Sequence, residues 1–177
     1  MKGSMTLEEF AAFAAKKHVD RGYTYADGVP YSVHLNGVAN LVRKYAYLLE
    51  GTGVDPDDVE KAAHGHDLYE DCGLTFNDLS KRCGTNAARM ILAVSDVPGE
   101  DRIEKIYLTL PKVRAAGLGA TLLKLCDRMF NGMQNGSMQG KYRVEYPIVR
   151  YILISRTDMV FRPLWEDLDK MFGYEES

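Results

Sequence analysis

The chain has 177 residues, of which 46% are hydrophobic and 27% charged, an ordinary globular mixture that is long enough for one domain with a sizeable core. Its net charge of −3 at pH 7 argues against a surface built to bind a nucleic-acid polymer, but leaves room for a local basic pocket that binds a phosphorylated small molecule. We expect neither a membrane-spanning segment nor a signal peptide, because apolar runs are short and the first twenty residues carry several charges.

Helical signals follow one another along the first half of the chain. Thr6 and Glu9 have the spacing of a capping box, and apolar residues at helical spacing follow them. Asp55 with Pro56 is a second helix start, and Thr75 with Asp78 is a third. The predicted helices of this half span about 7–18, 33–50, 56–69, 75–84 and 85–95.

The second half of the chain is predicted to be helical as well. Pro111 is expected to interrupt a helix over 101–115, and Pro147 to kink or bound one over 141–157. A strongly apolar, buried helix over 118–131 and a short tail helix over 162–172 complete the set.

Strand patterns, repeats and linkers are scarce or missing, so the sequence predicts an all-α protein with a single compact domain over 5–177. Residues 1–4 are expected to be an expression remnant, with Met5 as the native start. The three cysteines form no C-x-x-C pair and indicate reduced thiols in a cytoplasmic protein.

The segment AAHGHDLYEDCG, residues 62–73, carries the densest group of chemically active side chains. On a helix, residues four apart share a face, which places His66 beside Glu70 and Asp67 beside Asp71. One imidazole and three carboxylates on neighbouring faces repel one another unless a cation lies among them. Mixed nitrogen and oxygen ligands suit Mn²⁺, Fe²⁺ or Zn²⁺ better than Ca²⁺.

Further ligands are expected from two other helices. His34 lies near the start of one, and Asp127 interrupts the apolar helix over 118–131, with Lys124 and Asn131 along the same stripe. A carboxylate in a core-like helix is costly unless it is paired or bound to a metal. Each residue taken singly also has an ordinary explanation, since acids often lie on solvated faces and Asp127 could pair with Lys124 or Arg128.

The order of these motifs resembles that of the HD-domain metal-dependent phosphohydrolases. More narrowly, it is similar to the hydrolase branch of the RelA/SpoT alarmone enzymes, in particular the small stand-alone alarmone hydrolases such as the metazoan SpoT homologues. The resemblance covers about residues 6–156. It is carried by a helix that ends in His18, by Pro30–Tyr31 with His34, by His66–Asp67 with Glu70–Asp71, and by Lys124–Leu125 with Asp127 and Asn131.

The resemblance implies an HD-domain helical bundle with one metal, usually Mn²⁺, and with Fe²⁺, Zn²⁺ and Mg²⁺ as alternatives. The implied metal ligands are His34, His66, Asp67 and Asp127. Glu70 and Asp71 would position or activate the attacking water. The expected substrate contacts come from Asn131, Lys124, Arg21 and Tyr31.

The implied reaction is release of pyrophosphate from the 3′ position of (p)ppGpp, without a covalent intermediate. Two alternatives stay open: a phosphatase acting on NADPH or a nucleoside 5′-monophosphate, and a catalytically silent HD domain that only binds a nucleotide. The expected partner is a small-molecule nucleotide, for a protein that is a monomer or a homo-oligomer.

The chain also departs from the family pattern at two places. His64 stands where the family has an apolar residue, and we expect it to be a core histidine rather than a ligand. The following Gly65 is expected to weaken its helix by up to about 1 kcal/mol relative to Ala. Between His18 and Pro30 the only basic residue is Arg21, although tyrosines in this loop could stack on a base.

Overall fold

The computed structural model describes residues 4–134, 137–154 and 158–175. Residues 1–3 of the expected expression remnant and residues 155–157 of the helix predicted over 141–157 lie outside the described residues. Within the described ranges, no helix is both long and apolar enough to cross a membrane.

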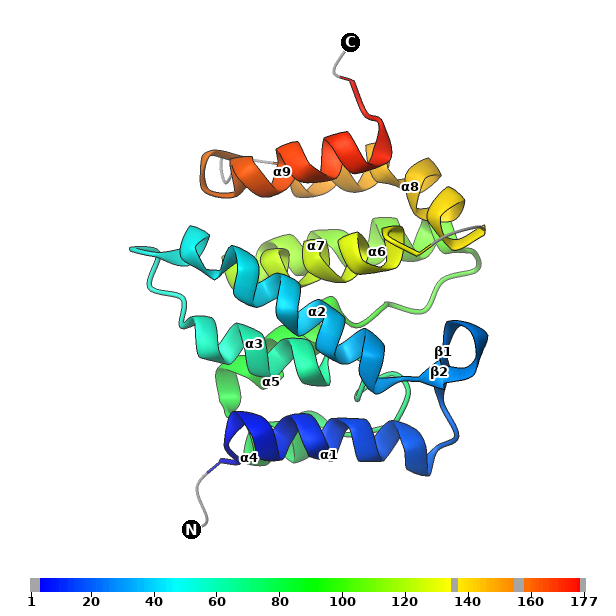
Figure 1. Ribbon diagram of the computed structural model, residues 1–177. Helices are drawn as coiled ribbons and strands as arrows, with labels where there is room; N and C mark the ends of the chain where they lie inside the picture. The colour runs from blue at the N-terminus through cyan, green and yellow to red at the C-terminus, as the bar shows by residue number, and fades with distance from the viewer. Residues whose placement is uncertain (1–3, 135–136, 155–157, 176–177) are drawn as a thin grey trace.

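The described part of the chain is helical almost throughout, which confirms the all-α prediction (Figure 1). The α-helices are α1 (Leu7–Asp20), α2 (Ser32–Tyr45), α3 (Pro56–Gly65), α4 (Phe76–Cys83), α5 (Thr85–Val94), α6 (Arg102–Ala115), α7 (Leu118–Gly132), α8 (Ser137–Leu153) and α9 (Asp158–Phe172). Two 3₁₀ helices (Ala26–Gly28 and Ala46–Leu49) and one antiparallel pair of two-residue strands, β1 (Thr24–Tyr25) and β2 (Val29–Pro30), complete the elements.

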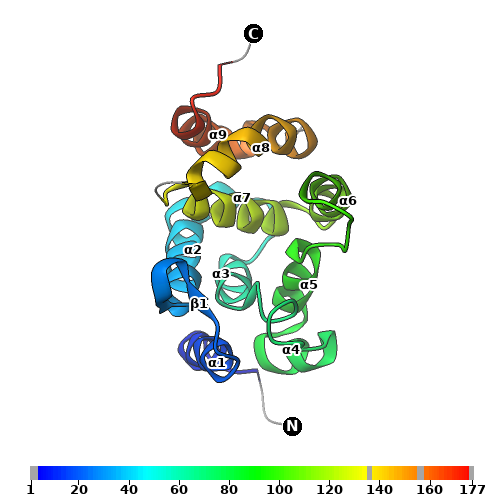
Figure 2. The ribbon, with the colours of Figure 1, turned by 90° about the vertical axis from the view of Figure 1, so that its right-hand side faces the viewer.

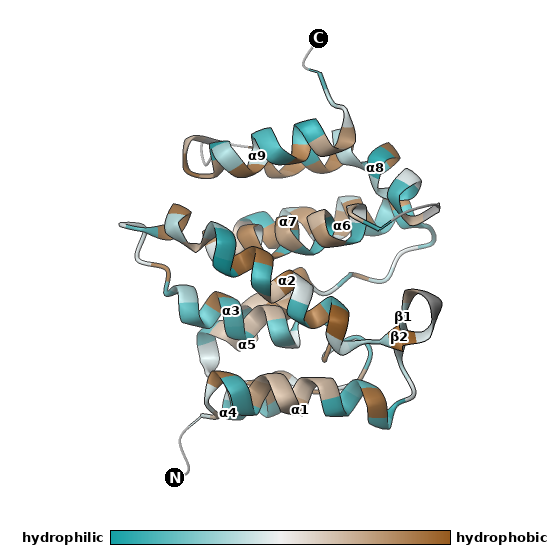
Figure 3. Ribbon diagram, in the orientation of Figure 1, coloured by the Kyte–Doolittle hydropathy of each residue, from teal (hydrophilic) through white to brown (hydrophobic). Residues whose placement is uncertain are grey.

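The helices stack in layers, and α7 lies near the middle of the stack. Helices α8 and α9 cover one side of α7, α3 and α5 lie on the opposite side, and α2 and α6 flank it (Figures 1 and 2). Figure 3 shows apolar residues prevailing on α5 and α7, whereas hydrophilic and apolar residues alternate along the outer helices α1 and α9. The side chain of Asp127 is therefore held in the interior of the protein by the most central helix.

Helix starts follow the local signals in the sequence. Thr6 and Glu9 form both hydrogen bonds of a capping box at α1, and Thr75 with Asp78 forms another at α4. At α3 the Asp55 side chain accepts a hydrogen bond from the backbone N–H of Asp57. These three starts confirm the predictions made from the sequence.

Several helix boundaries, at either end, differ from the predictions. The helix predicted over 56–69 ends at Gly65, and residues 66–72 form turns instead. Residues 46–49 of the helix predicted over 33–50 are a 3₁₀ helix, and α8 begins before residue 141. Helix α9 begins at residue 158, but its backbone angles are non-helical at Phe161, and the part after this kink is the tail helix predicted over 162–172.

The two prolines predicted to break helices lie inside them. Pro111 is within α6 and Pro147 within α8. At α6 both Pro111 and Tyr107, four residues earlier, are exposed, so water can solvate the carbonyl that proline leaves without a helical donor. The helix therefore continues past Pro111, with water in place of the lost hydrogen bond.

Gly65 has a packing role that propensity alone does not show. A Cβ atom at this position would lie 2.8 Å from the Phe10 ring and 3.0 Å from the Ile91 side chain, so α1 and α5 approach the end of α3 closely because glycine is there. Gly65→Ala is therefore expected to lower the free energy of unfolding by about 1–3 kcal/mol through overpacking. Urea denaturation measures this change.

Gly140 offers a matched control for Gly65→Ala. It lies in α8, and a Cβ atom there would meet nothing within 4 Å. Gly140→Ala should leave stability unchanged or raise it by about 0.4–1 kcal/mol, because alanine restricts the unfolded chain. Equal changes for the two variants would contradict the packing role of Gly65.

Candidate metal and active site

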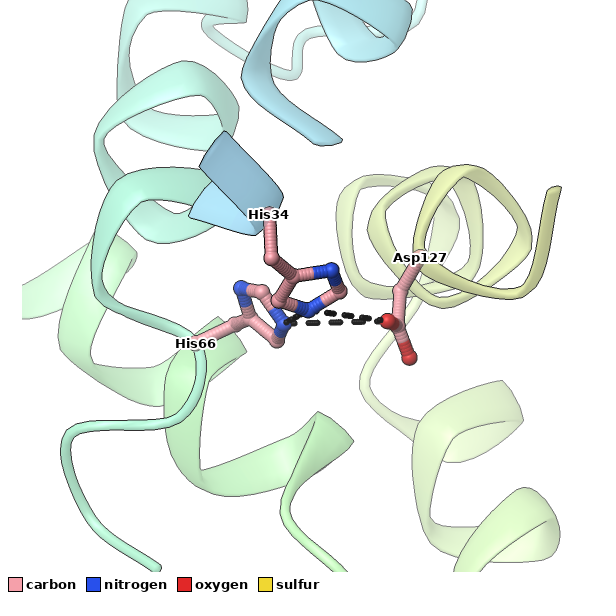
Figure 4. A group of neighbouring side chains, drawn as sticks. All are labelled: His34, His66 and Asp127. Atoms are coloured by element: carbon pink, nitrogen blue, oxygen red, sulfur yellow. Dashed lines mark hydrogen bonds and ion pairs between the residues drawn. The ribbon is translucent and has the colours of Figure 1, made fainter. Parts of the chain in front are cut away.

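Three helices bring two histidines and one aspartate to a single point (Figure 4). His34 lies in the first turn of α2, His66 directly follows α3, and Asp127 lies in the middle of α7. One ligand atom from each lies within 4.8 Å of the others, and all three residues are buried. The predicted convergence of these residues is therefore seen in the structure.

The distances within this group, and the hydrogen bond of His66, fit a metal ion. The Nε2 atoms of His34 and His66 are 3.0 Å apart, and lie 3.6 and 3.7 Å from Oδ1 of Asp127. Two nitrogens bound to one ion at about 2.1 Å with a right angle between them would also be about 3.0 Å apart. Nδ1 of His66 donates to the backbone carbonyl of Ala63 at 2.8 Å, so Nε2 is the ring atom that can bind a cation in place of a proton.

Asp67 lies beside the same two imidazoles. Its Oδ2 is 3.4 Å from Nε2 of His34 and 3.1 Å from Nε2 of His66, and it accepts a hydrogen bond from the Tyr31 hydroxyl at 2.6 Å. Burial by itself would raise the pKa of Asp67, but His66 and His34 hold that pKa well below its ordinary value. Its role as a fourth ligand stays a prediction.

The carboxylates favour positive charge at the centre of the group. Burial disfavours the protonated form of His66, yet Asp67 and Asp127 outweigh burial and raise the pKa of His66 to about 9. This shift shows how strongly the two carboxylates attract a cation at this point. The donor set of imidazole and carboxylate therefore fits a borderline divalent ion.

The two predicted substrate residues of α7 are engaged with the site itself. The Asn131 amide donates to Oδ1 of Asp127 at 2.7 Å and accepts from the Tyr25 hydroxyl at 2.7 Å. Nζ of Lys124 donates to the Val94 carbonyl and lies 3.7 Å from Oδ2 of Asp127. Asn131 thus orients Asp127, whereas contact of either residue with substrate stays a prediction.

The strand pair β1–β2 places an aromatic ring over one ligand. The Tyr25 ring stacks on His34 with 4.8 Å between ring centroids and an interplanar angle of 15°. Because its hydroxyl also bonds Asn131, Tyr25 holds His34 and, through Asn131, Asp127. This role differs from the base stacking that the sequence suggested for a tyrosine of this loop.

The two acids predicted to handle the attacking water lie on the turns after α3. Oε1 of Glu70 accepts a hydrogen bond from the backbone N–H of Asp96 at 2.7 Å, and desolvation raises the pKa of Glu70 above its ordinary value. Oδ2 of Asp71 lies 3.6 Å from Nε2 of the buried His18. Glu70 is thus hydrogen-bonded to the segment after α5, and Asp71 faces α1. The two acids do not lie on a shared helical face.

The other residues singled out from the sequence have defined positions too. Nη2 of Arg21 donates to the backbone carbonyl of Cys72 at 3.1 Å, so this predicted substrate residue holds the end of the turns over 66–72. His64 is buried and lies outside the group of His34, His66 and Asp127, in line with the expected core role. Substrate contact by Arg21 or by Tyr31 stays a prediction.

A small basic cavity next to Asp127 was missed by the sequence reasoning. It has a volume of about 50 Å³, and Arg102, Lys105, Lys124 and Arg128 contribute positive charge to its wall. Both arginines lie over the Tyr142 ring, with guanidinium carbons 5.2 and 4.9 Å from its centroid. The sequence does contain a signal for this group: Arg128 directly follows Asp127 in an apolar helix, and a second buried charge there also needs a partner.

The partner of both arginines is Glu145 of α8. Its buried carboxylate accepts hydrogen bonds from Arg102 and from Arg128, and thereby ties α6 and α7 to α8. Glu145→Ala would leave the buried Arg128 guanidinium without this carboxylate, and is expected to cost about 3–5 kcal/mol of unfolding free energy at neutral pH. Urea denaturation measures it, with the exposed pair Arg162–Glu166 as a control worth about 0–1 kcal/mol.

The effect of Glu145 has a defined pH dependence. Burial opposes its ionisation, but Arg102 and Arg128 outweigh burial and lower the pKa of Glu145 below the ordinary 4.5. The stabilisation is therefore fully present above pH 4.5 and is lost as pH falls through the lowered pKa. A difference between wild type and Glu145→Ala that grew on acidification would contradict this pairing.

Comparison with known proteins gives concordant similarities. No family model matches the chain. It is 30% identical over 125 residues to the human guanosine-3′,5′-bis(diphosphate) 3′-pyrophosphohydrolase MESH1 and 31% identical to that of Danio rerio, covering 71% of this chain and 66% of each relative. The chain thus spans just under two thirds of these relatives. A Vibrio cholerae guanosine-3′,5′-bis(diphosphate) 3′-pyrophosphohydrolase is 27% identical over 134 residues, which are 18% of its length.

A solved structure shares the fold over nearly the whole chain. It is a metazoan orthologue of SpoT, described as hydrolysing ppGpp, and it matches with a TM-score of 0.74 and 21% identity over 99% of both chains. The motifs with His34, with His66 and with Asp127 are brought together in this chain as the sequence resemblance implied. The chain is therefore a relative of the MESH1 proteins and has the all-helical fold of the metazoan SpoT orthologue.

Proposed function

We propose that this protein is an HD-domain phosphohydrolase that removes the 3′-pyrophosphate of (p)ppGpp with a divalent cation and a water molecule. The observation that carries the proposal is the convergence of His34, His66 and Asp127 on one point. Glu70 follows His66 closely in the sequence and is held by the backbone N–H of Asp96. The similarity to named 3′-pyrophosphohydrolases supports the choice of substrate.

The cation would be held by His34, His66 and Asp127, with Asp67 as the fourth protein ligand. When bound, a divalent cation lowers the pKa of water and polarises a phosphoryl oxygen. Mn²⁺ is the first choice, and Fe²⁺, Zn²⁺ and Mg²⁺ are alternatives that mixed nitrogen and oxygen donors also accept. Metal analysis of the purified protein discriminates among these ions.

The chain's own residues supply the remaining chemistry. Glu70 accepts a proton from the attacking water, and its raised pKa makes it a better base than an ordinary glutamate. The water oxygen bonds to the phosphorus attached to O3′, the P–O3′ bond breaks, and O3′ takes up a proton, giving GDP from ppGpp together with pyrophosphate. Lys124 and Lys105, on the wall of the cavity beside Asp127, would supply positive charge to phosphate groups, since Arg102 and Arg128 are already paired with Glu145.

Lys124 is suited to stay charged in this position. Burial lowers the pKa of its ammonium group, but Asp127 and Asp96 outweigh burial, and the net shift is upward. The ammonium lies 3.5 Å from Oδ1 of Asp96 and 3.7 Å from Oδ2 of Asp127. It therefore offers a fixed positive charge beside the metal ligands.

Incubation of the Mn²⁺-loaded protein with a nucleotide panel tests the proposal. Pyrophosphate and GDP from ppGpp are the expected products, identified by anion-exchange chromatography. Orthophosphate from NADPH or from a nucleoside 5′-monophosphate, without pyrophosphate from ppGpp, would replace the proposed substrate. Tight nucleotide binding without turnover would instead make the protein a silent nucleotide-binding domain.

The cellular setting is proposed from the cysteines. Cys72, Cys83 and Cys126 are all buried and unpaired, as expected of a protein in a reducing compartment such as the cytoplasm. Whether the protein is a monomer or a homo-oligomer stays a prediction, which light scattering tests directly.

A further inference from the structure

His18 occupies an unusual position at the end of α1. Its side chain is fully buried, and Nδ1 donates to the Ala14 carbonyl at 2.9 Å. Nε2 is buried as well and has no hydrogen-bond partner among the described residues, while Oδ2 of Asp71 lies 3.6 Å away. A buried polar atom without a partner is costly, so its persistence calls for an explanation.

The same ring also contacts a residue that holds a predicted metal ligand. The His18 and Tyr31 rings stack with 4.3 Å between centroids and an interplanar angle of 7°. The Tyr31 hydroxyl donates to Oδ2 of Asp67 at 2.6 Å. The face of the His18 ring thus contacts Tyr31, which is hydrogen-bonded to Asp67. Its Nε2 atom approaches Asp71.

We propose that His18 is a positioning residue for the hydrolytic reaction, acting through Asp71 and Tyr31. With Nδ1–H committed to the Ala14 carbonyl, the Nε2 side of the ring is the one that faces Oδ2 of Asp71. The two atoms close to hydrogen-bond distance in the working complex, as catalytic contacts that are long in ligand-free structures do. The proposal rests on the proposed phosphohydrolase function.

The rigidity of its surroundings makes His18 suited to this role. Phe10 and Ala14 of the same helix are fully buried, so α1 is packed against the body of the protein along this face. A ring fixed in that way can hold Asp71 and Tyr31 in one orientation. Loss of Nε2 should lower kcat, the rate of the chemical step, while KM changes little.

His18→Phe tests the role, because phenylalanine keeps a ring to stack on Tyr31 and removes Nε2. We expect kcat to fall by about 10–100-fold, as for residues that support a site from behind, with KM and the Mn²⁺ content nearly unchanged. Phe13→Leu is the matched control, since Phe13 lies on the same helix and packs against Arg82 of α4, away from the site residues. Equal kcat values for the two variants would overturn the proposal.

A double-mutant cycle separates positioning from a general structural effect. Asp71→Asn should lower kcat, and adding His18→Phe should lower it little further, because the two residues act as a unit. Additive losses would overturn the proposal. The cycle uses whichever nucleotide the wild type hydrolyses, so failure of wild type to hydrolyse ppGpp counts against the proposed substrate alone.

Nitrogen-15 NMR gives a readout that does not depend on turnover. In the Mg²⁺-loaded protein, the Nε2 resonance of His18 is expected to shift in Asp71→Asn and to stay in place in Asp20→Asn. Asp20 lies on the same helix but pairs with Lys16 at its surface. An unchanged His18 resonance in Asp71→Asn would show that the two side chains do not interact, which overturns the proposal.

Discussion

Asp127→Asn is expected to remove the bound cation and with it the hydrolytic activity. Asparagine has nearly the same shape, so the fold should persist, but a neutral amide replaces the carboxylate that lies 3.6 and 3.7 Å from the two histidine Nε2 atoms. Substitutions that only support metal ligands cost about 10–100-fold in affinity, and loss of a ligand should cost more. Metal content and Mn²⁺ titration measure the effect.

Asp167→Asn is the control for this prediction. Asp167 is an exposed acid of α9 that pairs with Lys44, so its loss changes the net charge by the same amount without contacting the site. This variant should bind Mn²⁺ as the wild type does. Full Mn²⁺ occupancy in Asp127→Asn would contradict the assigned ligand role.

Glu70→Gln is expected to keep the metal and lose most of the rate. Its carboxylate is held by the backbone N–H of Asp96, and a glutamine can occupy the same place but cannot accept a proton from water. General-base catalysis is worth about 10²–10⁴-fold, so kcat should fall by this factor. Metal content should equal that of the wild type.

The pH profile gives Glu70 a second signature. Desolvation raises its pKa above the ordinary 4.5, and a base must be ionised to act, so the wild-type rate should fall as pH drops through this raised value. The exposed Glu166→Gln should reproduce the wild-type profile. A Glu70→Gln variant with the wild-type rate would contradict the role of general base.

The starts of α1, α3 and α4 could be predicted from the sequence because each depends on neighbouring residues. Thr6 and Thr75 form capping boxes whatever else the chain does, and both helices begin where expected. The end of α3 could not be predicted from neighbouring residues in this way. It depends on Gly65 packing against Phe10 and on His66 turning its Nδ1 to the Ala63 carbonyl, two contacts that only the folded protein makes.

The same distinction holds for the candidate site. The resemblance carried by the order of the motifs implied that His34, His66 and Asp127 would meet, and a costly acid in the apolar helix over 118–131 pointed the same way. The pairing of Arg102 with Glu145 joins residues 43 positions apart on different helices, and no local sequence pattern predicts it. Placing Tyr25 on His34 likewise requires the strand pair β1–β2, which is too short to leave a periodic signal.

Anomalous diffraction at the manganese edge, from crystals grown with Mn²⁺, tests the central claim most directly. The account predicts one strong peak within bonding distance of Nε2 of His34, Nε2 of His66 and a carboxylate oxygen of Asp127. A protein that holds no manganese at this point, or binds it only elsewhere, would contradict the account.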